Sequence, residues 1–273
     1  MYFYLHRLIK SRANFVKIIE NLGWLLYDKI IRLVVGLVIG VWLARYLGPG
    51  EYGLFNYALS VVGLFGAFAS LGLEGIVVRD LVYNNSPKEE TIGTAAFLMF
   101  LGGLIAYIFI LLLINWYQPN EIVHKVLIAI LGTIVILKGS EVALYWFESQ
   151  VMSKYVIWMK TCSFLTFAVI KLYLILMNAS LIAFAWATLG EALLTAILIM
   201  IALNLHGIKI KNLKVTINKS KYLLVNSWPL MLTGISTTIY MVINQIMLGQ
   251  MLDNNAVGIY SAAIRISEIW YFF

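Results

Sequence analysis

The sequence has 273 residues, of which 62% are hydrophobic and only 12% are charged, and its formal net charge is +7. Soluble domains carry about 25% charged residues, so the composition excludes an ordinary water-soluble domain. It indicates an all-α integral membrane protein, a polytopic helix bundle. In such a protein an excess of Lys and Arg marks cytoplasmic loops, and it does not indicate a nucleic-acid partner.

Long apolar runs predict eight membrane-spanning helices, each near the 20 or so residues that a bilayer crossing requires. We expect them at about 22–44, 53–76, 92–115, 123–147, 155–177, 180–203, 224–249, and from 257 to the end. Basic residues precede the first helix and occupy every second loop, which predicts a cytoplasmic N-terminus in the cytoplasmic membrane. These residues are Arg7, Lys10, Arg12, Lys17, Arg79, Lys88, Lys154, Lys209, Lys211, Lys214, Lys219 and Lys221.

The first predicted helix carries three charges, Asp28, Lys29 and Arg32. A charge at the centre of a membrane helix costs about 2.5–3.5 kcal/mol on insertion scales, and it usually faces the bundle interior or a wet cavity. Asp28 and Arg32 are four residues apart and can pair on one helix face. Arg32 suits phosphate binding because its planar guanidinium matches phosphate oxygens, whereas Lys29 can also snorkel to the interface. Gly36 and Gly40 form a GxxxG motif, which favours close helix packing.

Two further groups of charges follow in the second and fourth helices. Glu74 lies near the end of the second helix and is a candidate to neutralise Lys29 or Arg32. Lys138 and Glu141 are three residues apart on the fourth helix. They are expected to line a cavity as a pair, with an ion pair to the first helix as the alternative.

The last helices carry the remaining charges. Glu191 lies near the middle of the sixth helix, where a lone carboxylate can be held protonated and can couple transport to protons; pairing with Lys171 of the fifth helix is the alternative. Arg265 and Glu268 lie near the middle of the eighth helix. Arg265 is expected to face the first helix and to contact a substrate phosphate.

Two segments 205 residues apart align without a gap, LARYLGPGEYGLFNYA at 43–58 and LGQMLDNNAVGIYSAA at 248–263. The alignment places Gly53 on Gly258 and Leu43 on Leu248; a chance match of apolar residues is the alternative. A true repeat predicts two lobes that enter from the same side, with a substrate site between them. We therefore expect a cytoplasmic interfacial segment at 1–21, a six-helix lobe at 22–205, a basic cytoplasmic linker at 206–221, and at 222–273 the first two helices of a second, incomplete lobe.

The sequence resembles a known family of membrane proteins. LARYLGPGEYG, ASLGLEGIVVRDL, ALYWFESQ and YSAAIRISEIWYFF are similar to segments of the Wzx-type polysaccharide flippases, and the likeness is most specific over 24–81. These flippases belong to the multidrug/oligosaccharidyl-lipid/polysaccharide exporter superfamily. The resemblance implies two lobes around a central cavity. Because members of that family are longer, it also implies that the chain is C-terminally incomplete.

The resemblance implies a flippase, not an enzyme, that moves a polyprenyl-diphosphate-linked oligosaccharide from the cytoplasmic to the outer leaflet. Its expected partners are membrane lipid, the lipid-linked glycan and other polysaccharide-assembly proteins. Substrate binding is assigned to Lys29, Arg32, Lys138 and Arg265. Ion coupling or charge pairing is assigned to Asp28, Glu74, Glu141, Glu191 and Glu268.

Three other functions stay open at this point. They are a multidrug or cation antiporter of the same superfamily, a membrane-embedded glycan polymerase or transferase, and a non-functional truncated product. An antiporter predicts a cavity rich in carboxylates, and an enzyme predicts a large outer loop, whereas the predicted outer loops are short. The sequence contains no GxxxxGK[ST] phosphate loop and only one cysteine, Cys162. It therefore predicts no nucleotide or metal cofactor, and a proton or sodium gradient is an open source of energy.

Overall fold

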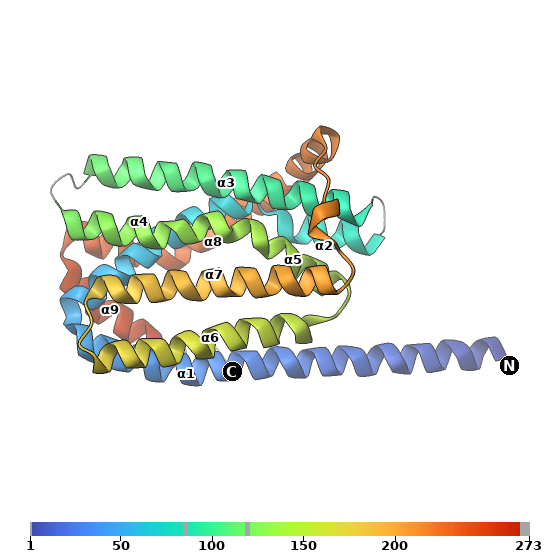
Figure 1. Ribbon diagram of the computed structural model, residues 1–273, viewed down its shortest axis with the longest axis horizontal. Coiled ribbons are helices and arrows are strands. Elements are labelled where there is room, and N and C mark those ends of the chain that lie inside the picture. Colours follow the sequence, from blue (N-terminus) through green and yellow to red (C-terminus); the bar gives the residue numbers. More distant parts are fainter. Residues whose placement is uncertain (1, 84–86, 118–120, 268–273) are drawn as a thin grey trace.

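A computed structural model describes residues 2–83, 87–117 and 121–267 as a bundle of helices (Figure 1). Within these ranges six helices are long and apolar enough to cross a membrane, and no strand occurs. The helices are α1 Tyr2–Ser70, α2 Leu73–Tyr83, α3 Lys88–Tyr117, α4 Ile122–Ile136, α5 Val142–Ser149, α6 Ser153–Leu176, α7 Leu181–Leu205, α8 Ile217–Met251 and α9 Asn254–Ser267. Two short 3₁₀ helices, η1 Leu137–Glu141 and η2 Ile210–Asn212, lie between them.

Helix α1 contains the first predicted span and most of the second, because it turns back on itself at Gly48 (Figure 1). Gly48 has φ 71° and ψ 171°, a conformation that glycine adopts without a side-chain clash. Pro49 follows directly, and its fixed φ suits the first turn of the returning stretch. Residues 2–47 form one unbroken helical stretch, which runs from the predicted interfacial segment into the first predicted span. Its one glycine near that boundary, Gly23, costs a helix only about 1 kcal/mol.

Two of the predicted spans are interrupted. Leu71 and Gly72 both have positive φ, 52° and 62°, and they separate α1 from α2 within the predicted helix 53–76. The 3₁₀ helix η1 separates α4 from α5 within the predicted helix 123–147. Each break falls inside a segment that the apolar pattern predicts as a single span. The second break carries Lys138 and Glu141, and it therefore shapes a charged part of the bundle.

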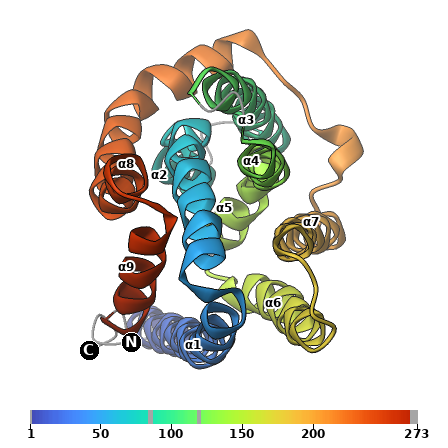
Figure 2. The ribbon, with the colours of Figure 1, turned by 90° about the vertical axis from the view of Figure 1, so that its left-hand side faces the viewer.

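The bundle has two ends, which we name by one residue each. The Gly48 end holds the turn of α1 and the connections α6–α7 and α8–α9, whereas the Asp80 end holds the end of α2, the α5–α6 connection and the linker 206–216. The first part of α1 extends beyond the bundle at the Asp80 end (Figure 1). Viewed from the Gly48 end, the returning stretch of α1 lies at the centre of the other helices (Figure 2).

The returning stretch of α1 supplies much of the core. Tyr52, Phe55 and Ala58 are buried against Leu131 of α4 and Phe184 of α7. Large apolar side chains are instead exposed on the outward faces of α3, α6, α7 and α8, as expected where lipid replaces water as the solvent. This distribution supports a multi-pass membrane protein.

The aligned repeat segments make reciprocal contacts. A β-carbon on Gly53 would lie 1.7 Å from the Asn254 carbonyl oxygen, and one on Gly258 would lie 2.0 Å from the Pro49 carbonyl oxygen. The shift of 205 residues that aligns Gly53 with Gly258 also aligns Pro49 with Asn254. Contacts that exchange partners in this way are those of a two-fold relation. They support a true repeat over a chance match of apolar residues.

A second pair of contacts follows the same rule deeper in the bundle. Arg265 lies against Gly40, where a β-carbon would be 2.5 Å from its Nη1 atom. The shift of 205 residues relates Arg265 to Ser60 and Gly40 to Gln245. Ser60 and Gln245 are joined by a hydrogen bond. The pseudo-two-fold relation therefore extends from the Gly48 end to the level of Arg265.

Candidate functional site

A cavity of about 130 Å³, which we call the central cavity, lies between α1, α6, α7 and α9. Its polar lining consists of Asn56, Lys171, Thr188, Glu191 and Arg265. Arg265 is 11 residues past the start of α9, or roughly 16 Å along the helix from the Gly48 end at 1.5 Å per residue. The central cavity therefore lies at a depth where ionised side chains are costly and are usually functional.

Arg265 enters the central cavity through the space left by a glycine. Its Nη1 atom donates to the Tyr52 hydroxyl oxygen at 3.2 Å, and Tyr52 is itself buried. Gly40 lies beside the guanidinium, whereas Gly36 has Phe164 as its nearest neighbour at 3.9 Å. The predicted GxxxG motif thus faces the side chains of Arg265 and Phe164. The expectation that Arg265 faces the first helix is met by these contacts.

Lys171 and Glu191 form an ion pair across α6 and α7. Lys171 Nζ lies 2.8 Å from Glu191 Oε2, and the two side chains are 16% and 22% exposed. Glu191 is therefore paired with Lys171 and is not a lone carboxylate. This pairing is the alternative that the sequence left open. Both groups line the central cavity together with Arg265. The charged side chains of this lining thus comprise two cations and one anion.

A larger cavity of about 480 Å³, which we call the Lys138 cavity, lies toward the Asp80 end between α1, α2, η1 and α8. Lys138 Nζ donates to Glu141 Oε1 at 2.8 Å, so the spacing of three residues brings this pair together as expected. Glu74 lines the same cavity, and so do Tyr145 and Thr238. The two carboxylates outnumber the one ammonium group, so this lining is net acidic.

Leu59 of α1 lines both cavities, which places the two hollows next to each other along the returning stretch of α1. The sequence predicts one shared cationic chamber. The structure instead has a small cavity with net positive charge and a larger one with net negative charge. The returning stretch of α1 lines both cavities, and Arg265, Lys171 and Glu191 line one whereas Lys138, Glu141 and Glu74 line the other.

The charges of the first helix form a third group outside both cavities. Arg32 Nε donates to both oxygens of Asp28, at 3.0 and 3.1 Å, and the Thr161 hydroxyl donates to Asp28 Oδ1 at 3.0 Å. The guanidinium of Arg32 lies 5.1 Å from the centre of the Phe164 ring. Phe164 also lines the central cavity. Lys29 is exposed.

Glu74 belongs to a different group of charges from the predicted one. Glu74 was expected to neutralise Lys29 or Arg32, but it lines the Lys138 cavity on α2, while Asp28 provides the carboxylate for Arg32. The reason is the break at Leu71 and Gly72, which redirects the chain before Glu74. Glu268 lies outside the described residues.

A family model described as "Polysaccharide biosynthesis protein" matches residues 18–270. The chain belongs to this polysaccharide biosynthesis protein family. The match covers the first seven predicted helices completely and the eighth as far as residue 270, and it confirms the resemblance to Wzx-type flippases. No curated protein matches the chain.

This polysaccharide biosynthesis protein is also similar to a solved structure, the inward-facing conformation of a multidrug resistance MATE family transporter of the MOP superfamily. The TM-score is 0.61 at 16% sequence identity, and the similarity covers 87% of the chain and 58% of the transporter. A likeness at this identity shows the fold alone. It confirms the predicted all-α polytopic architecture, and the chain spans 58% of the length of that transporter.

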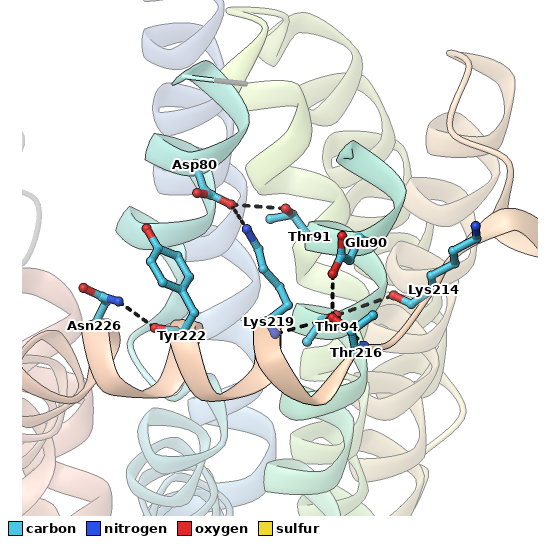
Figure 3. Close-up of polar contacts among 9 residues, drawn as sticks. All are labelled: Asp80, Glu90, Thr91, Thr94, Lys214, Thr216, Lys219, Tyr222 and Asn226. Atoms are coloured by element: carbon cyan, nitrogen blue, oxygen red, sulfur yellow. Dashed lines mark hydrogen bonds and ion pairs between the residues drawn. The ribbon is translucent and has the colours of Figure 1, made fainter. Parts of the chain in front are cut away.

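The sequence interpretation of this family member missed a buried polar cluster at the Asp80 end (Figure 3). Lys219 at the start of α8 is ion-paired with Asp80 of α2, and their side chains are 7% and 2% exposed. The Thr91 hydroxyl also donates to Asp80 Oδ2, at 3.1 Å. Lys219 was assigned only to the set of basic loop residues, and nothing in its local sequence distinguishes it from the exposed Lys221.

The same cluster fastens the basic linker to α3. The Lys214 amide donates to the Glu89 carbonyl oxygen at 3.3 Å, and the Thr216 hydroxyl donates to Glu90 Oε1 at 2.5 Å. Thr216 also caps α8 by accepting from the Lys219 amide at 3.4 Å. The linker before α8 is thus attached to α3, and the first turn of α8 is attached to α2 (Figure 3).

Proposed function

We propose that this protein is a flippase that moves a polyprenyl-diphosphate-linked oligosaccharide from the cytoplasmic to the outer leaflet for surface polysaccharide synthesis. The observation that carries the proposal is the net positive central cavity at membrane depth, which Arg265 lines while it donates a hydrogen bond to Tyr52. A buried cavity with two cations and one carboxylate attracts an anion, and a guanidinium binds phosphate oxygens in a fixed geometry.

The two cavities suit the two parts of such a substrate. The central cavity, at about 130 Å³, is the smaller of the two and would receive the diphosphate group. The Lys138 cavity, at about 480 Å³, falls within the range of small-molecule sites. Its carboxylates, Tyr145 and Thr238 offer hydrogen bonds to sugar hydroxyls. The lipid tail would remain in the bilayer.

The proposed orientation places the Asp80 end in the cytoplasm. The basic residues of the linker, Lys154 and Arg79 all belong to this end, and cytoplasmic loops carry the excess of Lys and Arg. Substrate would then reach the Lys138 cavity first and the central cavity second. We assign residues 22–205 to a first lobe and residues from 222 onward to a second, with the cytoplasmic membrane as the location. Rocking of the lobes about the pseudo-two-fold contact would expose the substrate alternately to the two sides.

A second candidate is a multidrug or cation antiporter of the same superfamily. The net acidic lining of the Lys138 cavity and the fold of the MATE family transporter favour it. In that function an organic cation would bind at Glu74 and Glu141, and the positive charge of the central cavity would have no direct role.

Transport in vesicles distinguishes the two functions. The protein is reconstituted into liposomes with a fluorescent polyprenyl-diphosphate-linked oligosaccharide, and the label accessible to an impermeant quencher is followed over time. In parallel, uptake of a fluorescent organic cation is measured under a proton gradient and under a sodium gradient. Translocation of the lipid-linked sugar without cation uptake supports the flippase. Cation uptake without lipid translocation would overturn it.

A further inference from the structure

The lining of the central cavity contains a cation that the sequence interpretation did not assign to substrate. Lys171 of α6 lies in the same cavity as Arg265 of α9, and its ammonium group is held at 2.8 Å by Glu191 of α7. The pair is largely buried and lines the cavity together with Asn56 and Thr188. Two cations from different helices therefore converge on one small space.

We propose that Lys171 is a second phosphate-binding residue, that Arg265 and Lys171 together select a diphosphate over a monophosphate, and that Glu191 holds Lys171 in place and moderates the affinity. This inference rests on the proposed function, because it assumes that the central cavity receives the phosphate end of the substrate. A diphosphate has two anionic centres, and a cavity with two separate cations satisfies both. A monophosphate has only one anionic centre, and Arg265 alone can bind it.

Glu191 explains why the cavity can also release its ligand. With Lys171 and Arg265 positive and Glu191 negative, the charged lining sums to one positive charge. Without Glu191 it would sum to two, and a diphosphate would be bound too tightly to leave. A transporter must bind its substrate strongly enough to capture it and weakly enough to let it go. The ion pair thus tunes the cavity between these limits.

This role differs from that of a structural ion pair in the sign of its effects. Removing either partner of a purely structural pair leaves the other charge buried and unpaired, and both changes destabilise the fold. In the proposed role the two changes act in opposite directions on affinity. Loss of the Lys171 charge weakens diphosphate binding, whereas loss of the Glu191 charge strengthens it.

The experiment measures dissociation constants of the full chain in lipid nanodiscs for farnesyl diphosphate and farnesyl monophosphate. Lys171→Gln is expected to weaken diphosphate binding about tenfold or more, which is the loss of one charge-assisted hydrogen bond. Its effect on monophosphate binding is expected to be within about twofold. Glu191→Gln is expected to tighten diphosphate binding and to slow its dissociation. The control is Lys160→Gln, on the same helix but outside the central cavity, which is expected to change neither constant.

A double variant keeps the test valid if Lys171→Gln alone does not fold. Lys171→Gln/Glu191→Gln leaves no unpaired charge, and it differs from Glu191→Gln only at Lys171. Weaker diphosphate binding by the double variant than by Glu191→Gln supports the inference, and equal binding overturns it. If Arg265→Gln lowers affinity while the Lys171 variants do not, this inference fails and the proposed function stands. If the Arg265 variant also binds unchanged, the proposed function fails as well.

Discussion

Gly53 of α1 and Gly258 of α9 lie so close together that neither position has room for a side chain. A β-carbon on Gly53 would lie 2.7 Å from the amide nitrogen of Gly258. The two residues are equivalent in the 205-residue repeat, and they close the Gly48 end of the bundle between the two proposed lobes. The contact is made by backbone atoms, which cannot rotate away as a side chain can.

Gly53→Ala should therefore destabilise the protein. Overpacking of a close contact costs about 1–3 kcal/mol, and the backbone of α9 would have to move to accept the added methyl group. Gly63→Ala is the matched control, because Gly63 lies on the same stretch of α1 with nothing within 4 Å of its β-carbon position. The midpoint of thermal unfolding in detergent checks this, with a clear decrease expected for Gly53→Ala only. Equal midpoints for both variants would show that the contact does not hold the two lobes together.

The GxxxG motif gives a prediction that separates binding from stability. A β-carbon at position 40 would lie 2.5 Å from Arg265 Nη1, and this flexible group can move aside. Gly40→Ala should then leave the unfolding midpoint nearly unchanged but weaken farnesyl diphosphate binding about tenfold, because Arg265 is displaced from the central cavity. A β-carbon at position 36 would lie 3.9 Å from Phe164, which is an ordinary contact. The Gly36→Ala variant should therefore bind farnesyl diphosphate as the unmodified protein does. A similar affinity for both variants would count against the position assigned to Arg265.

The ion pair of Asp80 and Lys219 should be a major contributor to stability. Removing one partner of a buried pair typically costs about 3–5 kcal/mol, because the other charge remains buried. Asp80→Asn and Lys219→Met are each expected to show such a loss in a denaturant titration, with a smaller loss for the double variant. Lys221→Met, two residues away and exposed, should change stability by no more than about 0.5 kcal/mol. Similar values for the Lys219 and Lys221 variants would contradict the fastening of α8 to α2.

Asp253 predicts a dependence of stability on pH at the start of α9. The Ala256 amide donates to its carboxylate at 2.8 Å and the Asn255 side chain donates at 3.3 Å, and these hydrogen bonds lower the pKa of Asp253 below its ordinary value. A lowered folded-state pKa contributes stability that is present above the unfolded-state value near 4 and is lost as the pH falls through the folded-state value. Unfolding midpoints measured between pH 7 and pH 3 should therefore fall less steeply for Asp253→Asn. An identical slope in both proteins would refute this role of the hydrogen bonds.

The sequence predicts the parts of this molecule that depend on local spacing. Asp28 and Arg32 at four residues, and Lys138 and Glu141 at three, are paired because the helical period places them on one face. The turn at Gly48 was also predictable, since it separates two apolar runs and contains glycine and proline. The 205-residue repeat was visible in the alignment of Gly53 with Gly258.

The parts that were not predictable depend on contacts between distant segments. Asp80 and Lys219 are 139 residues apart, and no local pattern marks either one as buried. The breaks at Gly72 and η1 fall inside segments predicted as single spans, and the first of them moves Glu74 away from Lys29 and Arg32. The division of the charges into two cavities follows from the central position of the returning stretch of α1, which only the packed structure reveals.

The central claim is that Arg265 binds the phosphate of a lipid-linked sugar at membrane depth. Translocation of a polyprenyl-diphosphate-linked oligosaccharide in proteoliposomes, compared between the unmodified protein and Arg265→Gln, tests this claim most directly. With equal amounts of inserted and folded protein, we expect the variant to translocate the substrate at least about tenfold more slowly. An unchanged rate for Arg265→Gln would contradict the claim.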